Sequence, residues 1–251
     1  MSITITMLIM GLILGFVGAG GSGTIIAILN VFFGIPIHTA LGTSLAAMVF
    51  TTLSGAYSHY REGNVVIKTG VVVGLFGAAG SFIGSQIAQL IPGHDLKWMT
   101  ASMLFLSAIL LGFKIFMSSN HKSIEGTEMP SSLRFWTAAG GVGIVSGILA
   151  GTFGIGSTPF IQIGLLTFLG MTIQQSAGTT MLVILPIALI GSTGYYTSGN
   201  LDIKLFIEVV LGTLIGTYIG AKFTTRLHPV VLKTATIIMP IIGGLLLLLG
   251  F

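Results

Sequence analysis

The chain has 251 residues, of which 53% are hydrophobic and only 6% are charged, and its mean hydropathy is +1.03. Soluble domains carry about 25% charged residues, so this composition excludes a soluble protein and predicts an all-α polytopic membrane protein. The absence of cysteine excludes disulfides and thiolate metal sites. The net charge of +4 comes from basic residues scattered over loops, which predicts no nucleic-acid surface.

Long apolar runs divide the chain into eight segments separated by short connections. One polar linker is long enough to separate two halves, and it holds His121, Lys122, Glu125, Glu128 and Pro130. We therefore expect a first membrane repeat over 1–117, a linker over 118–133 and a second repeat over 134–251. The eight segments are 3–33, 38–60, 66–90, 96–117, 134–168, 174–197, 203–225 and 230–250.

The two halves resemble each other at a fixed spacing. At an offset of 136, Gly63-Asn64 aligns with Gly199-Asn200 and Ile67-Lys68 aligns with Ile203-Lys204. The glycine clusters that begin at Gly18 and Gly151 fit an offset of 133, which predicts a three-residue insertion between cluster and next segment. Two homologous repeats of four segments follow from this pattern.

Segments 3–33 and 134–168 exceed the roughly 20 residues that span a bilayer. Each holds a glycine cluster near its middle, which predicts two pieces of about 15 residues. If both broken segments re-enter on one side, basic residues divide 8 to 2 between the two sides; if all eight segments cross, they divide 6 to 4. The positive-inside rule thus favours re-entrant helix pairs and inverted repeats. Eight plain spans with parallel repeats are the alternative.

Glycine clusters at membrane depth are expected only where the broken backbone is buried in protein or lines a cavity. Paired breaks in two repeats point to a transporter's substrate site. A half-helix that begins there presents free N–H groups and a positive dipole end, which suit an anion. Close helix packing is the alternative role for such glycines. The predicted site residues at the breaks are Gly21, Ser22, Gly23, Thr24, Gly154, Gly156, Ser157 and Thr158.

Hydroxyl residues follow each break at equivalent positions, with Thr43 and Ser44 in the first half and Thr179 and Thr180 in the second. These hydroxyls are predicted to complete the site. They could instead satisfy the broken backbone.

Two ionisable residues inside the segments, His59 and Glu208, could carry a coupling proton. Snorkelling of the side chain to the interface is the alternative for both. An enzymatic reading also exists, because Gly20-Gly21-Ser22-Gly23 matches the short Gly-x-Ser-Gly pattern of intramembrane serine proteases, with His59 as base. The pattern is short and lies within a duplicated break, so we predict no enzyme, and neither a metal nor a cofactor.

A glycine-rich break followed by Gly42-Thr43-Ser44, and again by Gly178-Thr179-Thr180, resembles the sulfite exporter TauE/SafE family, which includes toluenesulfonate uptake permeases. The resemblance spans about Gly11 to Leu249. The first break holds a serine where the family usually has glycines, and the proline that often follows is present only as Pro159.

The resemblance implies a permease of a bacterial cytoplasmic (inner) membrane, surrounded by lipid. Its implied substrates are small sulfur-containing anions such as sulfite and sulfonates, including sulfoacetate, with export the commoner direction. Two other functions remain open: a transporter or channel for a metal ion or other small metabolite, and a membrane assembly protein that transports nothing. The sequence leaves homo-oligomerisation and the coupling ion open.

Overall fold

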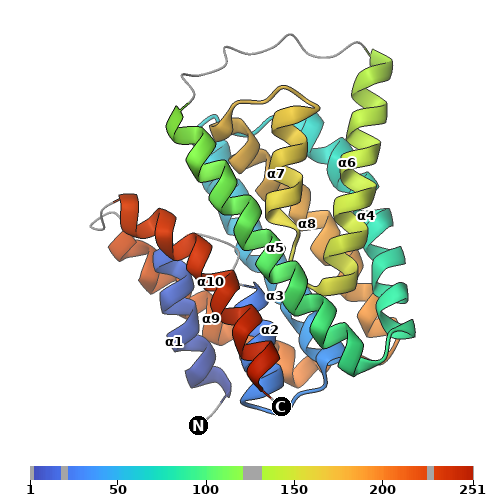
Figure 1. The fold of residues 1–251 in the computed structure, drawn as a ribbon, viewed down its shortest axis with the longest axis vertical. Coiled ribbons are helices and arrows are strands. Elements are labelled where there is room, and N and C mark those ends of the chain that lie inside the picture. The colour runs from blue at the N-terminus through green and yellow to red at the C-terminus, as the bar shows by residue number, and fades with distance from the viewer. Residues whose placement is uncertain (1–2, 18–21, 121–131, 225–228, 251) are drawn as a thin grey trace.

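A computed structural model describes residues 3–17, 22–120, 132–224 and 229–250, and these residues form helices and no strand (Figure 1). Side chains are described over the same ranges except at 14–17, 114–120, 132, 221–224 and 229–233. The helices of the described ranges are α1 (Ile3–Val17), α2 (Ser22–Val31), α3 (Ile37–Arg61), α4 (Ile67–Leu90), α5 (Gly93–Asn120), α6 (Ser132–Phe153), α7 (Thr158–Thr167), α8 (Ile173–Thr197), α9 (Ile203–Thr224) and α10 (Pro229–Leu249).

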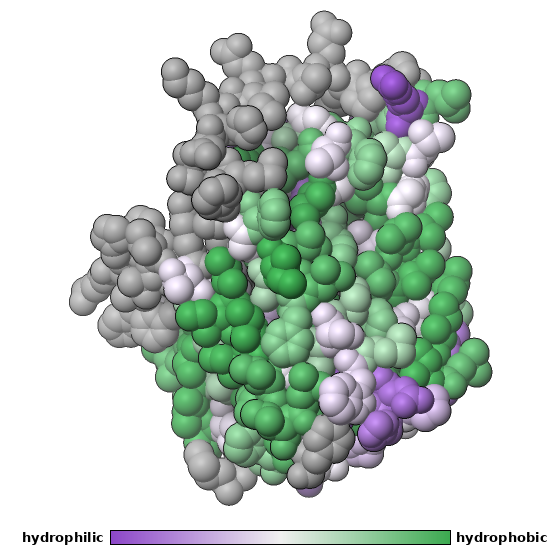
Figure 2. Space-filling model, viewed as in Figure 1, coloured by the Kyte–Doolittle hydropathy of each residue, from purple (hydrophilic) through white to green (hydrophobic). Residues whose placement is uncertain are grey.

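Six of the described helices, α3, α4, α5, α6, α8 and α9, are long and apolar enough to cross a membrane. In the view of Figure 2 the surface between the two ends of the molecule is largely hydrophobic, and the strongly hydrophilic side chains lie near the ends. The prediction of an all-α, multi-pass membrane protein is confirmed. Its long helices also match the predicted segments closely, as with α3 against 38–60 and α8 against 174–197.

The two glycine-broken segments divide less evenly than predicted. The first forms helices of 15 and 10 residues, but the second forms helices of 22 and 10 residues, so its break does not lie near the middle. Gly151 stays helical, because its missing side chain lets α6 approach Ser81 of α4, and the helix ends only at Phe153.

Most helix starts and several helix ends recur at one spacing. Thr158 begins α7 136 residues after Ser22 begins α2, and Ile173 begins α8 136 residues after Ile37 begins α3. Phe153 ends α6 136 residues after Val17 ends α1. The expected three-residue insertion is therefore wrong, since the breaks and the helices that follow share the offset of 136.

The two helix pairs that contain the breaks run in opposite senses along the molecule (Figure 1). Both chain termini lie at one end, and there the last turn of α2 meets the end of α10, where Gly250 approaches Val31. The pair α6 and α7 starts and finishes at the opposite end, where Phe135 shares a hydrophobic cluster with Leu169.

Close backbone contacts at glycine hold the long helices together. A Cβ atom on Gly80 of α4 would collide with the Ile144 carbonyl of α6, and one on Gly216 of α9 would collide with the Leu8 carbonyl of α1. These glycines therefore serve close packing between helices. Helices α3 and α8 cross between these two pairs, with Gly42 of α3 against Tyr195 of α8.

Candidate functional site

The first break leads into α2, whose opening residues are buried. Ser22 and Thr24 are each 2% exposed, and the Thr24 hydroxyl donates a 3.4 Å hydrogen bond to the Met239 carbonyl of α10. Gly23 faces Leu104 of α5, so α2 begins between α3, α5 and α10. Gly21, the remaining predicted residue of this break, lies outside the described residues.

The second break is a run of left-handed backbone. Gly154 has φ +65°, Gly156 has φ +66° and Ser157 has φ +48°, after which Pro159 stands in the first turn of α7. Glycine adopts these angles freely, whereas serine pays about 1 kcal/mol for them. Ser157 is fully buried, and its side chain makes no capping hydrogen bond to α7. The buried, strained serine is therefore not explained by helix capping.

Both breaks meet on one face of α3. The Ser44 hydroxyl donates to the Ser22 carbonyl at 3.2 Å, so this face contacts the start of α2. A Cβ on Gly154 would lie 2.8 Å from Leu41 Cδ2, and one on Gly156 would meet the end of Met48. Positions 41, 44 and 48 share a helix face, and 44 and 48 are about 6 Å apart along the axis. The two breaks are thus brought together against the first half of α3.

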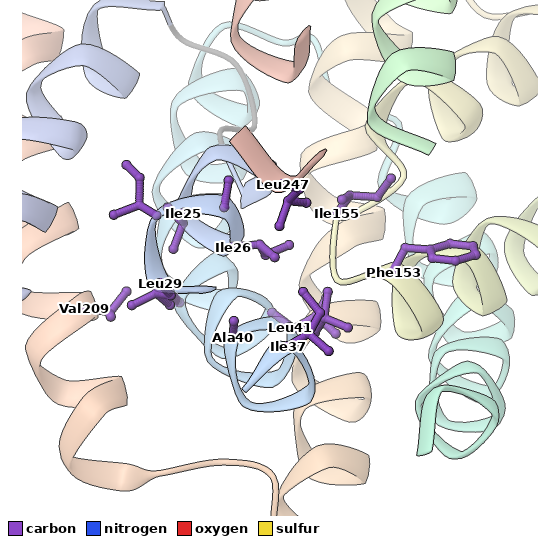
Figure 3. Packing of buried hydrophobic residues seen from close by; sticks show 14 of the residues in the cluster. Ile25, Ile26, Leu29, Ile37, Ala40, Leu41, Phe153, Ile155, Val209 and Leu247 are labelled. Atoms are coloured by element: carbon purple, nitrogen blue, oxygen red, sulfur yellow. The ribbon is translucent and has the colours of Figure 1, made fainter. Parts of the chain in front are cut away.

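Hydrophobic side chains surround this meeting point. Ile26 of α2, Leu41 of α3, Ile155 of the second break and Leu247 of α10 lie in one cluster (Figure 3). Their burial keeps water away from the adjoining polar groups, which strengthens any electrostatic contact made there.

Three predicted site residues carry buried hydroxyls that find no hydrogen-bond partner within the described part of the chain: Ser22, Thr43 and Ser157. A buried hydroxyl left without a partner costs about 1–3 kcal/mol. Two of the three, Ser22 and Ser157, stand at the starts of α2 and α7, where the first N–H groups of a helix also lack partners within that helix. A ligand rich in acceptor oxygens would satisfy both kinds of donor.

The hydroxyls of α8 are engaged differently. The Thr180 hydroxyl donates to Ser176 O at 2.6 Å, and the Ser176 hydroxyl donates to Gln162 O of α7 at 3.0 Å. Thr179 accepts a 3.0 Å hydrogen bond from the N–H of Val66, at the start of α4. Thr179 thus satisfies backbone in this structure, the alternative role that the sequence left open, while Thr180 lies level with the start of α7.

His59 and Glu208 lie at opposite ends of the molecule. His59 is in the last turn of α3, where Nδ1 is 3.5 Å from the Glu62 carboxylate. Glu208 is one turn before Gly212, which packs against Thr4 at the start of α1, at the end that holds the chain termini. The two side chains therefore cannot form one short proton relay.

The position of His59 also separates it from Ser22, so these two residues do not form the serine–histidine pair considered from the sequence. Ser22 contacts Ser44, and His59 lies 15 residues further along α3, about 22 Å at 1.5 Å per residue. A general base must lie within hydrogen-bond reach of its nucleophile. The described residues contain no group of three His, Asp or Glu side chains placed to hold a metal ion.

Tyr195 is a residue at this site that the sequence did not single out. Its side chain is fully buried in α8, and its hydroxyl donates to the carbonyls of Gly151 and Thr152 at 2.8 and 3.3 Å. These are among the last carbonyls of α6 before the break. The available signal was weak, because Tyr195 aligns with His59 at the offset of 136, and an aromatic residue there also suits simple packing.

Comparison with known proteins supports a transport role. The family model described as "Sulfite exporter TauE/SafE" matches residues 3–247. A probable membrane transporter protein, YdhB of Bacillus subtilis, is 53% identical over 99% of this chain and 100% of its own length. Probable membrane transporters of Xylella fastidiosa and Methanocaldococcus jannaschii are 26% and 24% identical, over 87% and 89% of this chain and 82% and 87% of their own lengths. No solved structure matches. The chain is thus a multi-pass integral membrane protein that belongs to the sulfite exporter TauE/SafE family.

Proposed function

We propose that this protein is a secondary active transporter that moves small sulfur-containing anions, such as sulfite and sulfonates including sulfoacetate, across a bacterial cytoplasmic membrane. Export is the proposed direction. The substrate binds between the two breaks, and alternating access comes from movement of one repeat against the other.

The observation that carries the proposal is the pair of buried, unpartnered hydroxyls of Ser22 and Ser157 at the starts of α2 and α7, where both breaks meet α3. Helix starts and hydroxyls donate hydrogen bonds to oxyanions. No buried Lys or Arg is found among the described residues, so the anion would be held by neutral donors and released easily. The first-turn N–H groups of Gly23, Thr24 and Thr158, together with Thr43, Ser44 and Thr180, complete the proposed shell.

Inverted repeats are part of the proposal, and two observations support them. Most helix starts and several helix ends recur at 136 residues, and the pairs α1–α2 and α6–α7 return to opposite ends of the molecule. Among the described side chains, Arg61, Lys68 and Arg134 belong to the end where α3 finishes and α6 begins, and Lys97 and Lys204 belong to the other end, so the positive-inside rule favours the former as the cytoplasmic end.

The two other functions receive less support. A cation transporter needs carboxylates or carbonyl rings at its site, whereas the carboxylate of Glu208 lies near one end of α9. Unpartnered buried hydroxyls also occur away from the breaks, at Ser81 and Thr100, so what favours transport over an assembly function is that Ser22 and Ser157 both stand at helix starts where the two breaks meet.

Reconstitution tests the proposal. Purified protein in liposomes should take up radiolabelled sulfite in a saturable manner, and unlabelled sulfoacetate should compete, whereas chloride should not. Counterflow with sulfite inside the vesicles detects electroneutral exchange as well as net flux. Folded protein that carries none of these anions under either condition would refute the proposal and favour the assembly function.

A further inference from the structure

Helices α3 and α8 cross, and the contacts that α3 makes with α8 are equivalent to those that α8 makes with α3. Gly42 of α3 packs against Tyr195 and the Asn200 carbonyl, and Gly178 of α8 packs against His59 and the Asn64 carbonyl. Each residue of the second contact lies 136 positions from its counterpart in the first. The crossing at the centre is therefore two-fold symmetric at the level of contacts.

The flanking helix pairs are also equivalent. Gly147 of α6 approaches the Gly77 carbonyl of α4, and Gly11 of α1 approaches the Thr213 carbonyl of α9. These positions again differ by 136. The pairs α4–α6 and α1–α9 are thus matching units that pack internally in the same manner.

The contacts between those units and the central helices are not equivalent. On α8, Gly191 and Gly194 are buried against the hydroxyls of Ser81 and Ser85 of α4. The matching positions on α3 are Gly55, which is half-buried, and Ser58, which is exposed.

A Cβ on Gly55 would meet Met181 of α8 at 3.3 Å, and its three nearest atoms, out to 3.9 Å, all belong to that residue. Thr217 of α9, which corresponds to Ser81, is not among them. The unit α4–α6 is thus closed on α8, whereas α1–α9 stands away from the last turns of α3.

The uncovered part of α3 has two exposed faces of different chemistry. One face, at helical spacing, holds Leu53, Tyr57 and Tyr60 and suits lipid, whereas Phe50, one turn earlier, contacts Phe206 of α9. The other holds the exposed Ser54 and Ser58 and the half-buried Thr51 and Gly55, and it continues the helix face of Ser44, which bonds to the start of α2. Polar groups at membrane depth belong against protein or water rather than lipid. On the matching face of α8, Ile187, Gly191 and Gly194 are covered by α4, and only Ile190, the counterpart of Ser54, is exposed.

We propose that the structure represents one of two transport states, in which water enters by an access path along the polar face of α3, between α3 and α9, from the end of α3 as far as Thr51, while the buried Ala47 and Met48 separate it from Ser44 and the site. The path opens at the end assigned to the cytoplasm. The opposite end is closed by α4 on α8 and by Tyr195. In the other state α1–α9 closes on α3 and α4–α6 leaves α8. This inference deepens the proposed function and rests on it.

The absence of native cysteine makes the test direct. A charged, membrane-impermeant thiol reagent reacts only with a thiolate in water. Ser54→Cys and Ser58→Cys should react at least tenfold faster than Leu53→Cys and Tyr57→Cys, their matched controls at the same depth on the lipid face. Reaction should be faster from the cytoplasmic face of inverted vesicles than from the outer face of right-side-out vesicles. Equal rates within each pair, or faster labelling from the outer face, would overturn the path.

A second experiment tests the exchange of states. The Cβ on Gly191 would lie 3.4 Å from Ser81 Cβ, close to the spacing of a disulfide, about 3.8 Å. Ser81→Cys/Gly191→Cys should therefore cross-link on mild oxidation, and Gly55→Cys/Thr217→Cys should cross-link in the alternate state. The first cross-link should speed labelling at Ser54→Cys, and the second should slow it at least tenfold. Failure of Gly55→Cys/Thr217→Cys to cross-link in folded protein would refute the exchange.

Neither experiment requires a substrate. A protein that fails to carry sulfite yet shows these labelling and cross-linking patterns would refute the proposed substrate and keep the access path. A protein that transports sulfite but does not show these patterns would refute the access path and keep the proposed substrate.

Discussion

The phenol of Tyr195 in α8 donates a 2.8 Å hydrogen bond to the carbonyl of Gly151, three residues before the left-handed turn of the second break. This bond ties the last turn of α6 to the helix that crosses α3. The hydroxyl also reaches the Thr152 carbonyl at 3.3 Å. Its buried side chain therefore sets where α6 stops and where the second break lies relative to the first.

Removing only this hydroxyl tests its contribution. Tyr195→Phe keeps the ring but leaves two buried carbonyls without their partner, so we expect a loss of about 1–3 kcal/mol of stability. Tyr196→Phe is the control, since Tyr196 is exposed, and it should stay within about 0.5 kcal/mol. Thermal unfolding in detergent measures both. Equal midpoints for the two variants would mean that the phenol does not hold α6.

Glycine packing between α4 and α6 gives a second prediction. A methyl group on Gly147 would meet the Gly77 carbonyl, whereas one on Gly141, also in α6, would meet nothing within 4 Å. Gly147→Ala should therefore cost about 1–3 kcal/mol through overpacking. Gly141→Ala should be neutral or gain up to about 1 kcal/mol from helix propensity. Folded yield by size-exclusion chromatography separates them, and comparable losses at both positions would contradict the helix contact.

Ser157, whose backbone lies in the left-handed region, gives a third prediction. Ser157→Gly removes the side chain from a left-handed position, so we expect stability to rise by about 1 kcal/mol. The same change removes a proposed donor to the substrate, so affinity for sulfite should fall. A variant that is both more stable and fully active would show that Ser157 has no part in binding.

The effect on transport of the backbone conformation at the second break can be separated from the effect of conformational strain in a turn away from the site. Gly156 (φ +66°) lies against Met48 near the proposed site, and Gly199 (φ +73°) lies in the turn after α8 with nothing within 4 Å. Alanine at either position costs about 1–2 kcal/mol in conformational strain. Flux measured on equal amounts of folded protein should fall only in Gly156→Ala. A comparable fall in Gly199→Ala would trace the effect to strain alone.

Much of the fold follows from local signals in the sequence. Runs of apolar residues ended by Gly-Asn turns predict α3 and α8 almost to the residue, and Pro159 stands in the first turn of α7 as expected. The length of α6 could not be predicted, because Gly151 looks the same in a sequence whether it breaks a helix or lets α4 approach it.

The candidate site was only partly predictable for a related reason. A hydroxyl's partner depends on which helix lies opposite, so the equivalent residues Thr43 and Thr179 have different environments here. The roles of Tyr195 and of the polar face of α3 depend on the packing between repeats. Alignment of the halves shows which positions correspond, but it does not show which of two corresponding interfaces is closed.

The most direct test of the central claim is equilibrium binding of radiolabelled sulfite to purified protein. Ser22→Ala and Ser157→Ala should each weaken binding about tenfold, which corresponds to loss of one hydrogen bond of about 1.4 kcal/mol. Thr100→Ala removes another buried, unpartnered hydroxyl, on α5, and should bind sulfite like the wild type. Equal affinity in the wild type and all three variants would contradict a sulfite site between the two breaks.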